Sequence, residues 1–327
     1  MLQAMADAAH ILASDLKAAL LAYGLRADSI GPLASGAYAN SFRVTSNGRD
    51  YVARVRAKWA TPAEVIFAGH WARAVAAEVP VPVPLLPQGE VPTIQGRCVD
   101  IAPYIEHDDT HGHEASPDAW VRIGYWLGCM HRLGLPLVAN APVDLPYGNY
   151  PSQSLTQCFL DDARTQVPPQ LRPELSAAEA LLATTQEHLG AMRPLLPHGI
   201  VHGDMHFWNV LYVRHEPVAV VDLDFLQRGY LIADIAYASV WLTAWDRDRD
   251  GLWRGIQDRY IAAYEQGRRR EMSDAERRCL PWARVMNALF FFLQNIVYSR
   301  DQAKWRDDLK EAQDLVRSIE HGLPPSA

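Results

Sequence analysis

The amino-acid sequence predicts an α+β chain of two lobes, with a small mixed β-sheet lobe over residues 1–103 and a larger, mainly helical lobe over residues 104–327. Residues 29–105 contain alternating segments typical of strands, with one helical stretch among them. The later segments instead carry apolar stripes at helical spacing. A chain of 327 residues with 49% hydrophobic content is long enough to form two packed lobes.

The first lobe is expected to contain a β-hairpin. Residues 41–44 and 51–55 are strand-like runs, and Asn47-Gly48 lies between them. Both turn residues tolerate the positive φ angles that a tight hairpin requires, so this dipeptide is a strong turn signal. A helix over residues 62–78 should follow, because Val65, Ala68 and later apolar residues recur on one stripe. Residues 99–105 are then predicted to form the strand that leaves this lobe.

Helix start signals recur through the larger lobe. The Ser-Pro dipeptide at 116–117 combines an N-cap residue with a proline in the first turn. The capping-box pattern occurs at Ser176–Glu179 and again at Ser273–Glu276. An apolar stripe over residues 305–319 predicts a final helix that ends before Gly322.

Charge and cysteine usage exclude several function classes. The net charge of −7 argues against a nucleic-acid binder and weakly suits a cationic substrate. The four cysteines are far apart in the sequence, which favours reduced thiols in a cytoplasmic protein. A cleaved signal peptide is not expected, because no basic segment precedes an apolar run near the N-terminus. The most apolar run, residues 286–298, is too short to span a bilayer, so we expect a buried helix and no membrane partner.

The most informative segment runs from His202 to Asn209 and is followed by the apolar run 218–221 and Asp222. It places Asp204, Asn209 and Asp222 at the spacing that phosphoryl transfer from a nucleotide requires. In that reaction one carboxylate receives the proton of the acceptor hydroxyl, while an amide oxygen and a second carboxylate hold Mg²⁺ on the phosphates.

The pattern His-Gly-Asp-x-His-x-x-Asn, followed by a strand ending in Asp and by Asp-Ile-Ala at 234–236, closely resembles the aminoglycoside phosphotransferase superfamily. This group includes antibiotic kinases, choline kinases, the second type of homoserine kinase and bacterial Ser/Thr kinases. The resemblance implies a bilobal, protein-kinase-like fold that uses ATP with Mg²⁺, and GTP in place of ATP stays open. The chain departs from the family at residues 229–231, where Gly-Tyr-Leu replaces a segment that often carries proline.

By this resemblance, Asp204 is the catalytic residue that orients the acceptor hydroxyl and accepts its proton, and Asn209 and Asp222 are the metal ligands. Asp234 should be a buried acceptor for the loop backbone and His202. For Asp224, an added metal or substrate contact and an ordinary solvated carboxylate are equally good interpretations.

The spacing of His202 and His206 also suggests zinc. A zinc site would need a third ligand and a helix that Gly203 disfavours. We therefore expect His202 to hold the loop in shape. His206 takes the place of the kinase lysine beside the γ-phosphate, so a phosphate or acceptor contact is the hypothesis for it.

The first lobe should bring backbone amides and positive charge to the phosphates. Ser35 and Gly36 lie in a loop that resembles the degenerate nucleotide loop of the family, although an ordinary hairpin would look the same. In the next strand kinases carry Val-Ala-x-Lys, and this chain reads Val-Ala-Arg-Val-Arg over residues 52–56. With a shift of one residue, Arg54 is the best match to the lysine. Arg56 shares its strand face and stays an alternative.

Two further predictions complete the nucleotide site. Glu64 opens the helix after this strand and is expected to pair with Arg54; a plain N-terminal helix acid is the other interpretation. Pro103 and Ile105, on either side of Tyr104, match the hinge between the lobes, whose backbone would hold adenine.

The acceptor side is less defined by the sequence. Three tryptophans after the motif would form either an aromatic wall for the acceptor or part of the core; they are Trp241, Trp245 and Trp253. Three aspartates in the same region would attract a cationic acceptor or be solvated; they are Asp246, Asp248 and Asp250.

Together these features predict a cytoplasmic, ATP-dependent phosphotransferase, monomeric or homodimeric, that acts on a hydroxyl of a small molecule. Candidate acceptors are an aminoglycoside, a homoserine-like amino alcohol, a sugar or a choline-like alcohol. A Ser/Thr protein kinase, with an open acceptor groove, is the alternative. A pseudokinase is disfavoured because Asp204, Asn209 and Asp222 are all present.

Overall fold

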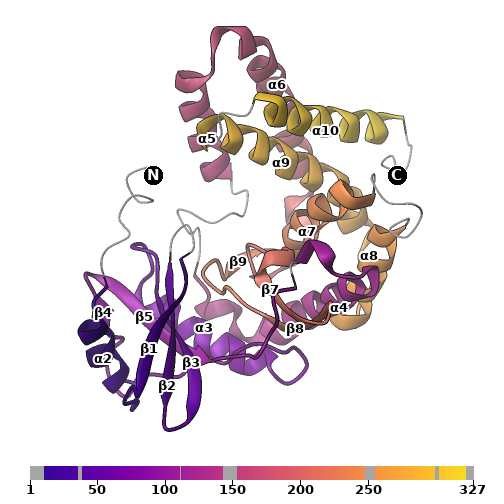
Figure 1. Cartoon of the computed structure of the whole chain (residues 1–327). Helices are drawn as coiled ribbons and strands as arrows, with labels where there is room; N and C mark the ends of the chain where they lie inside the picture. Colours follow the sequence, from indigo (N-terminus) through magenta and orange to yellow (C-terminus); the bar gives the residue numbers. More distant parts are fainter. Residues whose placement is uncertain are drawn as a thin grey trace.

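The structure is a computed structural model that describes residues 11–35, 39–110, 112–142, 153–246, 255–298 and 302–321. A five-stranded sheet lies at one end of the molecule, and the rest is mainly helical (Figure 1). The predicted α+β fold class with a small sheet lobe and a larger helical lobe is therefore confirmed. The expected boundary at residues 103/104 falls where the last strand of the sheet ends.

The sheet has five strands in the order β1-β2-β3-β5-β4. Their bounds are β1 Ser29–Ser35, β2 Asn40–Ser46, β3 Arg49–Val55, β4 Thr93–Ile94 and β5 Arg97–Pro103. Every neighbouring pair is antiparallel, so the prediction of a mixed sheet is wrong. Short turns join β2 to β3 and β4 to β5, which imposes this direction on those two pairs. The predicted hairpin turn is confirmed, with Asn47 and Gly48 at φ angles of 50° and 68°.

Helices cover this sheet and begin the larger lobe. Helix α2 (Ala13–Leu21) packs into the sheet core, and α3 (Pro62–Val75) follows β3. The predicted stripe on α3 is confirmed, because Val65, Ala68, Ala72 and Val75 are all buried. Helix α4 (Pro117–Gly134) begins at Ser116, whose side chain accepts from the Ala119 backbone as predicted.

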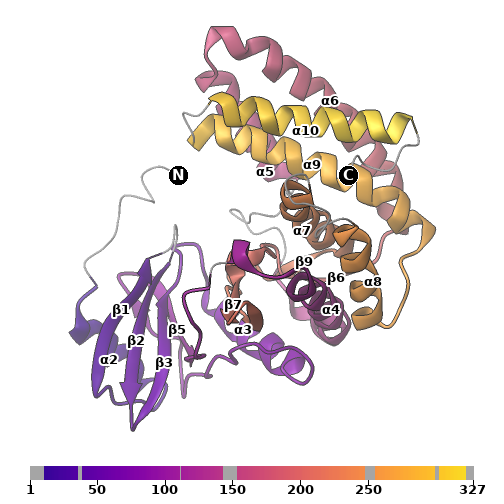
Figure 2. The same cartoon turned by 45° about the vertical axis from the view of Figure 1, so that its right-hand side comes forward.

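Two small two-stranded sheets lie between the five-stranded sheet and the helices (Figures 1 and 2). One pairs β6 (His198–Val201) with β9 (Gln227–Tyr230), and the other pairs β7 (Val210–Val213) with β8 (Glu216–Val220). Helix α7 (Leu231–Asp246) follows directly, and α8 (Ile256–Arg268) packs on α4. These strands hold both ends of the predicted catalytic loop.

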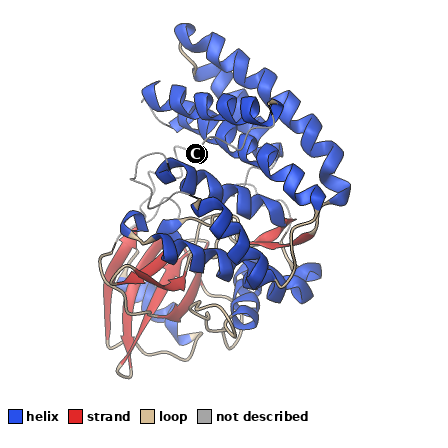
Figure 3. Ribbon diagram, turned by 90° about the vertical axis from the view of Figure 1, so that its right-hand side faces the viewer, coloured by secondary structure: helices blue, strands red, loops and turns tan. Residues whose placement is uncertain are grey.

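Four further helices form a separate unit with its own core (Figures 2 and 3). They are α5 (Gln153–Gln166), α6 (Arg172–Met192), α9 (Asp274–Tyr298) and α10 (Gln302–Glu320). The apolar run at 286–298 lies in α9, and no described helix is long and apolar enough to cross a membrane. Single turns of 3₁₀ helix occur at Gly112–Glu114, Pro169–Leu171, Arg193–Leu195 and Phe207–Asn209, with a longer one at Leu135–Asn140.

The two predicted capping boxes have different outcomes. Ser273 and Glu276 exchange hydrogen bonds at the start of α9, as expected. The helix start predicted at Ser176 is wrong, because α6 already begins at Arg172. Pro173 lies in its first turn, where a missing N–H costs nothing, and so the helix extends before the serine.

Candidate active site

The loop between β6 and β7 is held from beneath by Asp234, in the first turn of α7. Asp234 is completely buried, and its carboxylate accepts from the backbone N–H of His202 at 2.6 Å and of Gly203 at 3.0 Å. The predicted buried acceptor is thus confirmed. The structure adds His131 of α4, whose Nε2 lies 3.0 Å from Asp234 and whose Nδ1 contacts the Tyr264 hydroxyl.

His202 closes the loop on itself. Its Nδ1 accepts from the Asp204 backbone N–H at 3.4 Å, and its Nε2 lies 3.2 Å from the Val221 carbonyl at the end of β8. The ring therefore holds the loop in shape, as predicted, and it also links the loop to the segment that follows β8. Gly203 has a φ of 80°, and a Cβ there would lie 2.5 Å from the Phe225 carbonyl, so this position requires glycine.

Asp204 lies at the centre of a hydrogen-bonded group. The Tyr237 hydroxyl donates to its Oδ1 at 2.8 Å, and Asn209 Nδ2 donates to its Oδ2 at 2.9 Å. His206 Nε2 lies 3.2 Å from Oδ1. Burial and the Asp204 charge raise the pKa of Tyr237 well above its ordinary value, so Tyr237 stays a neutral donor. Tyr237 was not predicted, although it lies three residues after Asp234 on the same face of α7.

The hydrogen bonds also fix the orientation of His206 and Asn209. The Trp208 backbone N–H donates to His206 Nδ1 at 3.1 Å, so Nε2 carries the proton that points at Asp204. Asn209 Nδ2 donates to the backbone carbonyl of Asp204 at 2.7 Å as well as to its side chain. The amide oxygen of Asn209 is therefore the end left for a metal ion.

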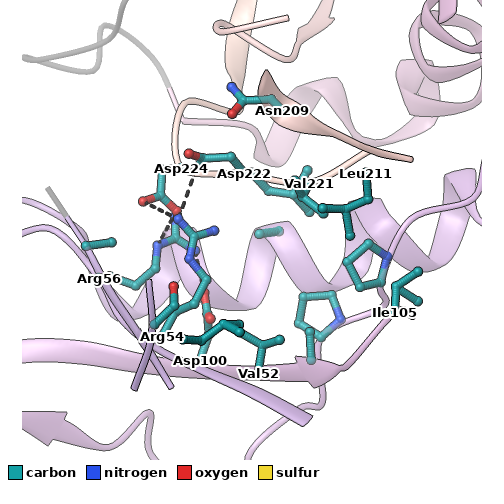
Figure 4. A pocket seen from close by; sticks show the side chains of 18 of the residues that line it. Val52, Arg54, Arg56, Asp100, Ile105, Asn209, Leu211, Val221, Asp222 and Asp224 are labelled. Carbon is teal, nitrogen blue, oxygen red and sulfur yellow. Dashed lines mark hydrogen bonds and ion pairs between the residues drawn. The ribbon is translucent and has the colours of Figure 1, made fainter. Parts of the chain in front are cut away.

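Asp222 follows β8 with a φ of 65°, a left-handed conformation that is unusual for a residue other than glycine. Its Oδ1 lies 3.0 Å from Arg54 Nη2. Burial acts to raise the pKa of Asp222, but Arg54 outweighs it and the pKa is lowered. Figure 4 shows Asn209 and Asp222 beside each other on one side of the cavity, facing Arg54 from β3.

Arg54 and Arg56 both reach Asp224 (Figure 4). Arg54 Nη2 lies 3.1 Å from Asp224 Oδ2, and Arg56 Nε lies 2.7 Å from Asp224 Oδ1. The Arg56 Nε–H is not aimed at that oxygen, so the second contact is electrostatic rather than a hydrogen bond. Arg56 Nη1 also donates to Asp100 Oδ2 at 2.7 Å. Burial raises the pKa of Asp224, which therefore depends on the two guanidinium groups for its charge.

Glu64 has a different role from the one predicted. Its Oε2 accepts from the Thr61 backbone N–H at 2.7 Å, and its own N–H donates to the Thr61 hydroxyl, which completes a capping box at the start of α3. The predicted pair of Glu64 with Arg54 is wrong in this structure, because Arg54 contacts Asp222 and Asp224 instead. The local capping geometry explains why the acid is there.

A cavity of about 580 Å³ lies between the sheet and the catalytic loop, and residues of the sheet and of the loop line it. Its polar end carries Asp204, Asn209 and Asp222, with Arg54 opposite. Its apolar end carries side chains of both lobes and the predicted hinge: Val52, Pro103, Tyr104, Ile105, Leu211 and Val221. Gly36 lies outside the described residues, as does the side chain of Ser35, which ends β1.

An aromatic cluster continues from the catalytic loop toward α7 and α9. Trp208 is 57% exposed, and its ring lies 5.2 Å from that of Trp241. Trp241 in turn lies 5.6 Å from Phe291, which contacts Tyr237. The side chains of Trp245 and Asp246, and all of Asp248, Asp250 and Trp253, lie outside the described residues.

Sequence similarity extends over most of the chain. The group described as the phosphotransferase enzyme family matches residues 29–273. An uncharacterized protein of Deinococcus radiodurans is 28% identical over 280 residues, which cover 82% of this chain and 77% of that protein. A homoserine kinase of Gluconacetobacter diazotrophicus is 30% identical over 175 residues. That match covers 53% of this chain and only about half, 51%, of the kinase.

Two solved structures share the fold. An amicoumacin kinase in complex with AMP-PNP and Ca²⁺ has a TM-score of 0.63 and 16% identity, with 95% of this chain and 93% of that chain covered. A spectinomycin phosphotransferase in complex with ADP and spectinomycin has a TM-score of 0.58 and 13% identity, with 95% and 98% covered. At these identities the likeness concerns the fold, which is that of protein-kinase-like phosphotransferases.

Proposed function

The chain belongs to the phosphotransferase enzyme family, whose members transfer a phosphoryl group to an alcohol, and on this premise we propose that its donor is ATP with Mg²⁺ and its acceptor a hydroxyl of a small molecule. The observation that carries the proposal is the position of Asp204. This carboxylate lines the same cavity as the metal-ligand pair Asn209 and Asp222 and the cation Arg54.

Asp204 is arranged to receive a proton. An ionised carboxylate offers about four acceptor positions. Tyr237 and His206 occupy Oδ1, whereas Asn209 occupies one position on Oδ2. The remaining position on Oδ2 can accept the hydrogen bond of an acceptor hydroxyl and then its proton. The three donors also fix the carboxylate, so the hydroxyl would be oriented rather than only deprotonated.

The other side of the cavity suits a metal-bound nucleotide. Asn209 and Asp222 offer two hard oxygen ligands, which fits Mg²⁺ because this ion takes its other ligands from phosphates and water. Mg²⁺, when bound, neutralises charge on the transferred group. Arg54 would bind phosphate oxygens through charge-assisted hydrogen bonds. The apolar end at Val52, Ile105 and the hinge would hold the base.

The acceptor we favour is small. Asp204 is only 5% exposed, which suits a compact alcohol better than a protein segment. Trp208 lines the cavity and packs against Trp241, and the two rings would contact the body of the acceptor. Homoserine-like amino alcohols are the first group to test, because homoserine kinases are among the relatives. Aminoglycosides, sugars and choline-like alcohols follow, with a Ser/Thr protein kinase as the alternative.

The test is a screen of hydroxyl-bearing metabolites, antibiotics and a Ser/Thr peptide for acceptor-dependent release of ADP or GDP, run with ATP and with GTP. We expect turnover with one class of small alcohol, dependent on Mg²⁺ and abolished in Asp204→Asn. Phosphorylation of the peptide alone would favour the protein-kinase alternative. The reaction would take place in the cytoplasm, which agrees with four free thiols. The proposed boundary between the two lobes lies at residues 103/104. For the oligomeric state, a monomer or a homodimer stays a prediction.

A further inference from the structure

Arg54 needs a carboxylate that fixes its guanidinium group, because a long cationic side chain on a strand is otherwise free to take many rotamers. In protein kinases the equivalent cation is fixed by a glutamate of the following helix. Here the acid at that place, Glu64, closes the capping box of α3. The carboxylates that touch Arg54 are Asp222 and Asp224.

We propose that Asp224 is the positioning residue for Arg54, and that Asp224 is itself held through Arg56 by Asp100. The proposal rests on the proposed function, since it assigns Arg54 to the nucleotide phosphates. In this proposal Asp224, two residues after the proposed metal ligand Asp222, has the role that the helix glutamate has in protein kinases.

Burial favours Asp224 over Asp222 as the permanent partner. The side chain of Asp224 is 6% exposed, whereas that of Asp222 is 33% exposed. Asp222 is also the proposed metal ligand, so a bound cation would compete with Arg54 for it. Both oxygens of Asp224 already contact guanidinium groups, one of Arg54 and one of Arg56. Asp224 is therefore committed to the arginines and not to the metal.

The far end of this series of ion pairs is anchored in the sheet. Asp100 on β5 lies directly opposite Arg54 on β3 and diagonally to Arg56, at a distance that long side chains span. The Arg56 side chain is only 3% exposed. Arg97 donates to the backbone carbonyls of Val55 and Arg56 at 2.9 and 2.7 Å, which fixes the end of β3. The five charged side chains from Asp100 to Asp222 thus connect the sheet to the loop after β8.

The experiment compares the two candidate anchors by removing charge and preserving shape. Asp224→Asn tests the proposed anchor. Glu64→Gln tests the rival, and it is well matched because glutamine also serves in a capping box. For each variant, calorimetry measures the affinity for ATP with and without Mg²⁺, kinetics measures KM for ATP and for the acceptor, and a thermal melt reports folding.

We expect Asp224→Asn to weaken ATP binding at least tenfold both with and without Mg²⁺, while KM for the acceptor changes less than twofold. Glu64→Gln should stay within twofold of wild type. In an Arg54→Ala background, Asp224→Asn should cause no further loss of metal-free affinity, because the two side chains act as one unit. A loss seen only with Mg²⁺ would instead make Asp224 a metal ligand and overturn the proposal.

Two controls keep the result decisive. If Asp224→Asn does not fold, Asp100→Asn is measured instead. We expect a smaller loss of ATP affinity in this variant, and no loss would overturn the proposal. Wild-type protein that does not bind ATP would refute the proposed function itself. If the wild type binds ATP, two results would refute only the role of Asp224. One is equal ATP affinity in Asp224→Asn, and the other is a larger loss of ATP affinity in Glu64→Gln.

Discussion

Tyr237 donates to Asp204 at 2.8 Å, and its raised pKa keeps the proton on the phenol at neutral and mildly alkaline pH. We expect Tyr237→Phe to lower kcat by roughly ten- to a hundredfold, because Asp204 loses the donor that holds Oδ1. KM for the nucleotide should be unchanged. Tyr260→Phe is the matched control, since the Tyr260 hydroxyl is buried with no hydrogen-bond partner among the described residues. Equal kcat for Tyr237→Phe and wild type would show that Asp204 is held without this donor.

Trp208 is a large apolar side chain that stays 57% exposed and lines the same cavity as Asp204, the proposed catalytic residue. If it contacts the acceptor, Trp208→Ala should raise KM for the acceptor by about tenfold, a loss of roughly 1.4 kcal/mol, with little change in KM for ATP. Leu195→Ala is the control, because Leu195 is 63% exposed on a separate turn and does not line the cavity. Steady-state kinetics with the acceptor varied at saturating ATP decides it, and unchanged acceptor KM would remove Trp208 from the acceptor site.

The residues that the sequence allowed us to place share one property: they lie in a short motif with fixed spacing. Asp204 and Asn209 are five residues apart, and their hydrogen bond follows from the loop itself. Asp100 and Tyr237 could not be placed in the same way. Their partners Arg56 and Asp204 are 44 and 33 residues distant, so strand register and helix packing decide which side chains meet.

At the scale of elements, one carboxylate at the start of α7 holds the catalytic loop. Asp234→Ala removes the acceptor of two backbone N–H groups and the partner of His131, all of them buried. We expect it to lower the free energy of unfolding by about 3 kcal/mol or more, because buried donors lose a charged partner. Urea unfolding measures this. Asp204→Asn should cost much less, since its amide oxygen still accepts, so equal midpoints for the two variants would contradict the role of Asp234.

Helices α4 and α8 approach each other at glycine. A Cβ added to Gly128 would lie 2.1 Å from the Tyr264 carbonyl oxygen, which is backbone and cannot turn aside. Gly128→Ala should therefore separate the helices and cost several kcal/mol, at the upper end of overpacking effects of about 1–3 kcal/mol. Gly190→Ala in α6 has open space around its Cβ and should be neutral or slightly stabilising. Thermal melts of both variants test the contact, and similar melting temperatures would mean that the pair can move apart cheaply.

Helix starts show where sequence reasoning failed at this scale. The Ser-x-x-Glu pattern is correct at Ser273, where the helix does begin, and wrong at Ser176, which lies inside α6. The two sites have the same local chemistry. The difference is that Pro173 suits the first turn of α6 and that Leu175 packs into the core of the four helices, so the helix starts before Ser176. A local motif marks a possible start, and packing of the neighbouring segment decides whether it is used.

For the whole molecule, the ion-pair chain from Asp100 to Asp222 links the sheet to the helical lobe across the cavity. It contains two guanidinium groups and three carboxylates, so these five side chains together keep one uncompensated negative charge. Such a charge is costly to bury alone, and a divalent cation bound with nucleotide phosphates would balance it. The two lobes would then share a ligand as well as an ionic contact, and ligand binding would stabilise both.

This argument predicts a thermal shift that depends on Mg²⁺. At an ATP concentration of 100 Kd the folded state gains about 2.7 kcal/mol, which for a chain of this size raises the Tm by roughly 4 °C. Asp222→Asn should lose most of the shift that Mg²⁺ adds to ATP, because the carboxylate that it removes is the proposed charged ligand of the metal. Asp204→Asn makes the same change from carboxylate to amide at a nearby residue. Because Asp204 is expected to face the acceptor and not the metal, this variant should retain the full shift. The Tm of wild type and both variants is measured with ATP alone and with ATP and Mg²⁺. If Asp204→Asn lost the shift and Asp222→Asn kept it, the two carboxylates would have to exchange roles, and the acceptor side of the cavity would be the side of Asp222.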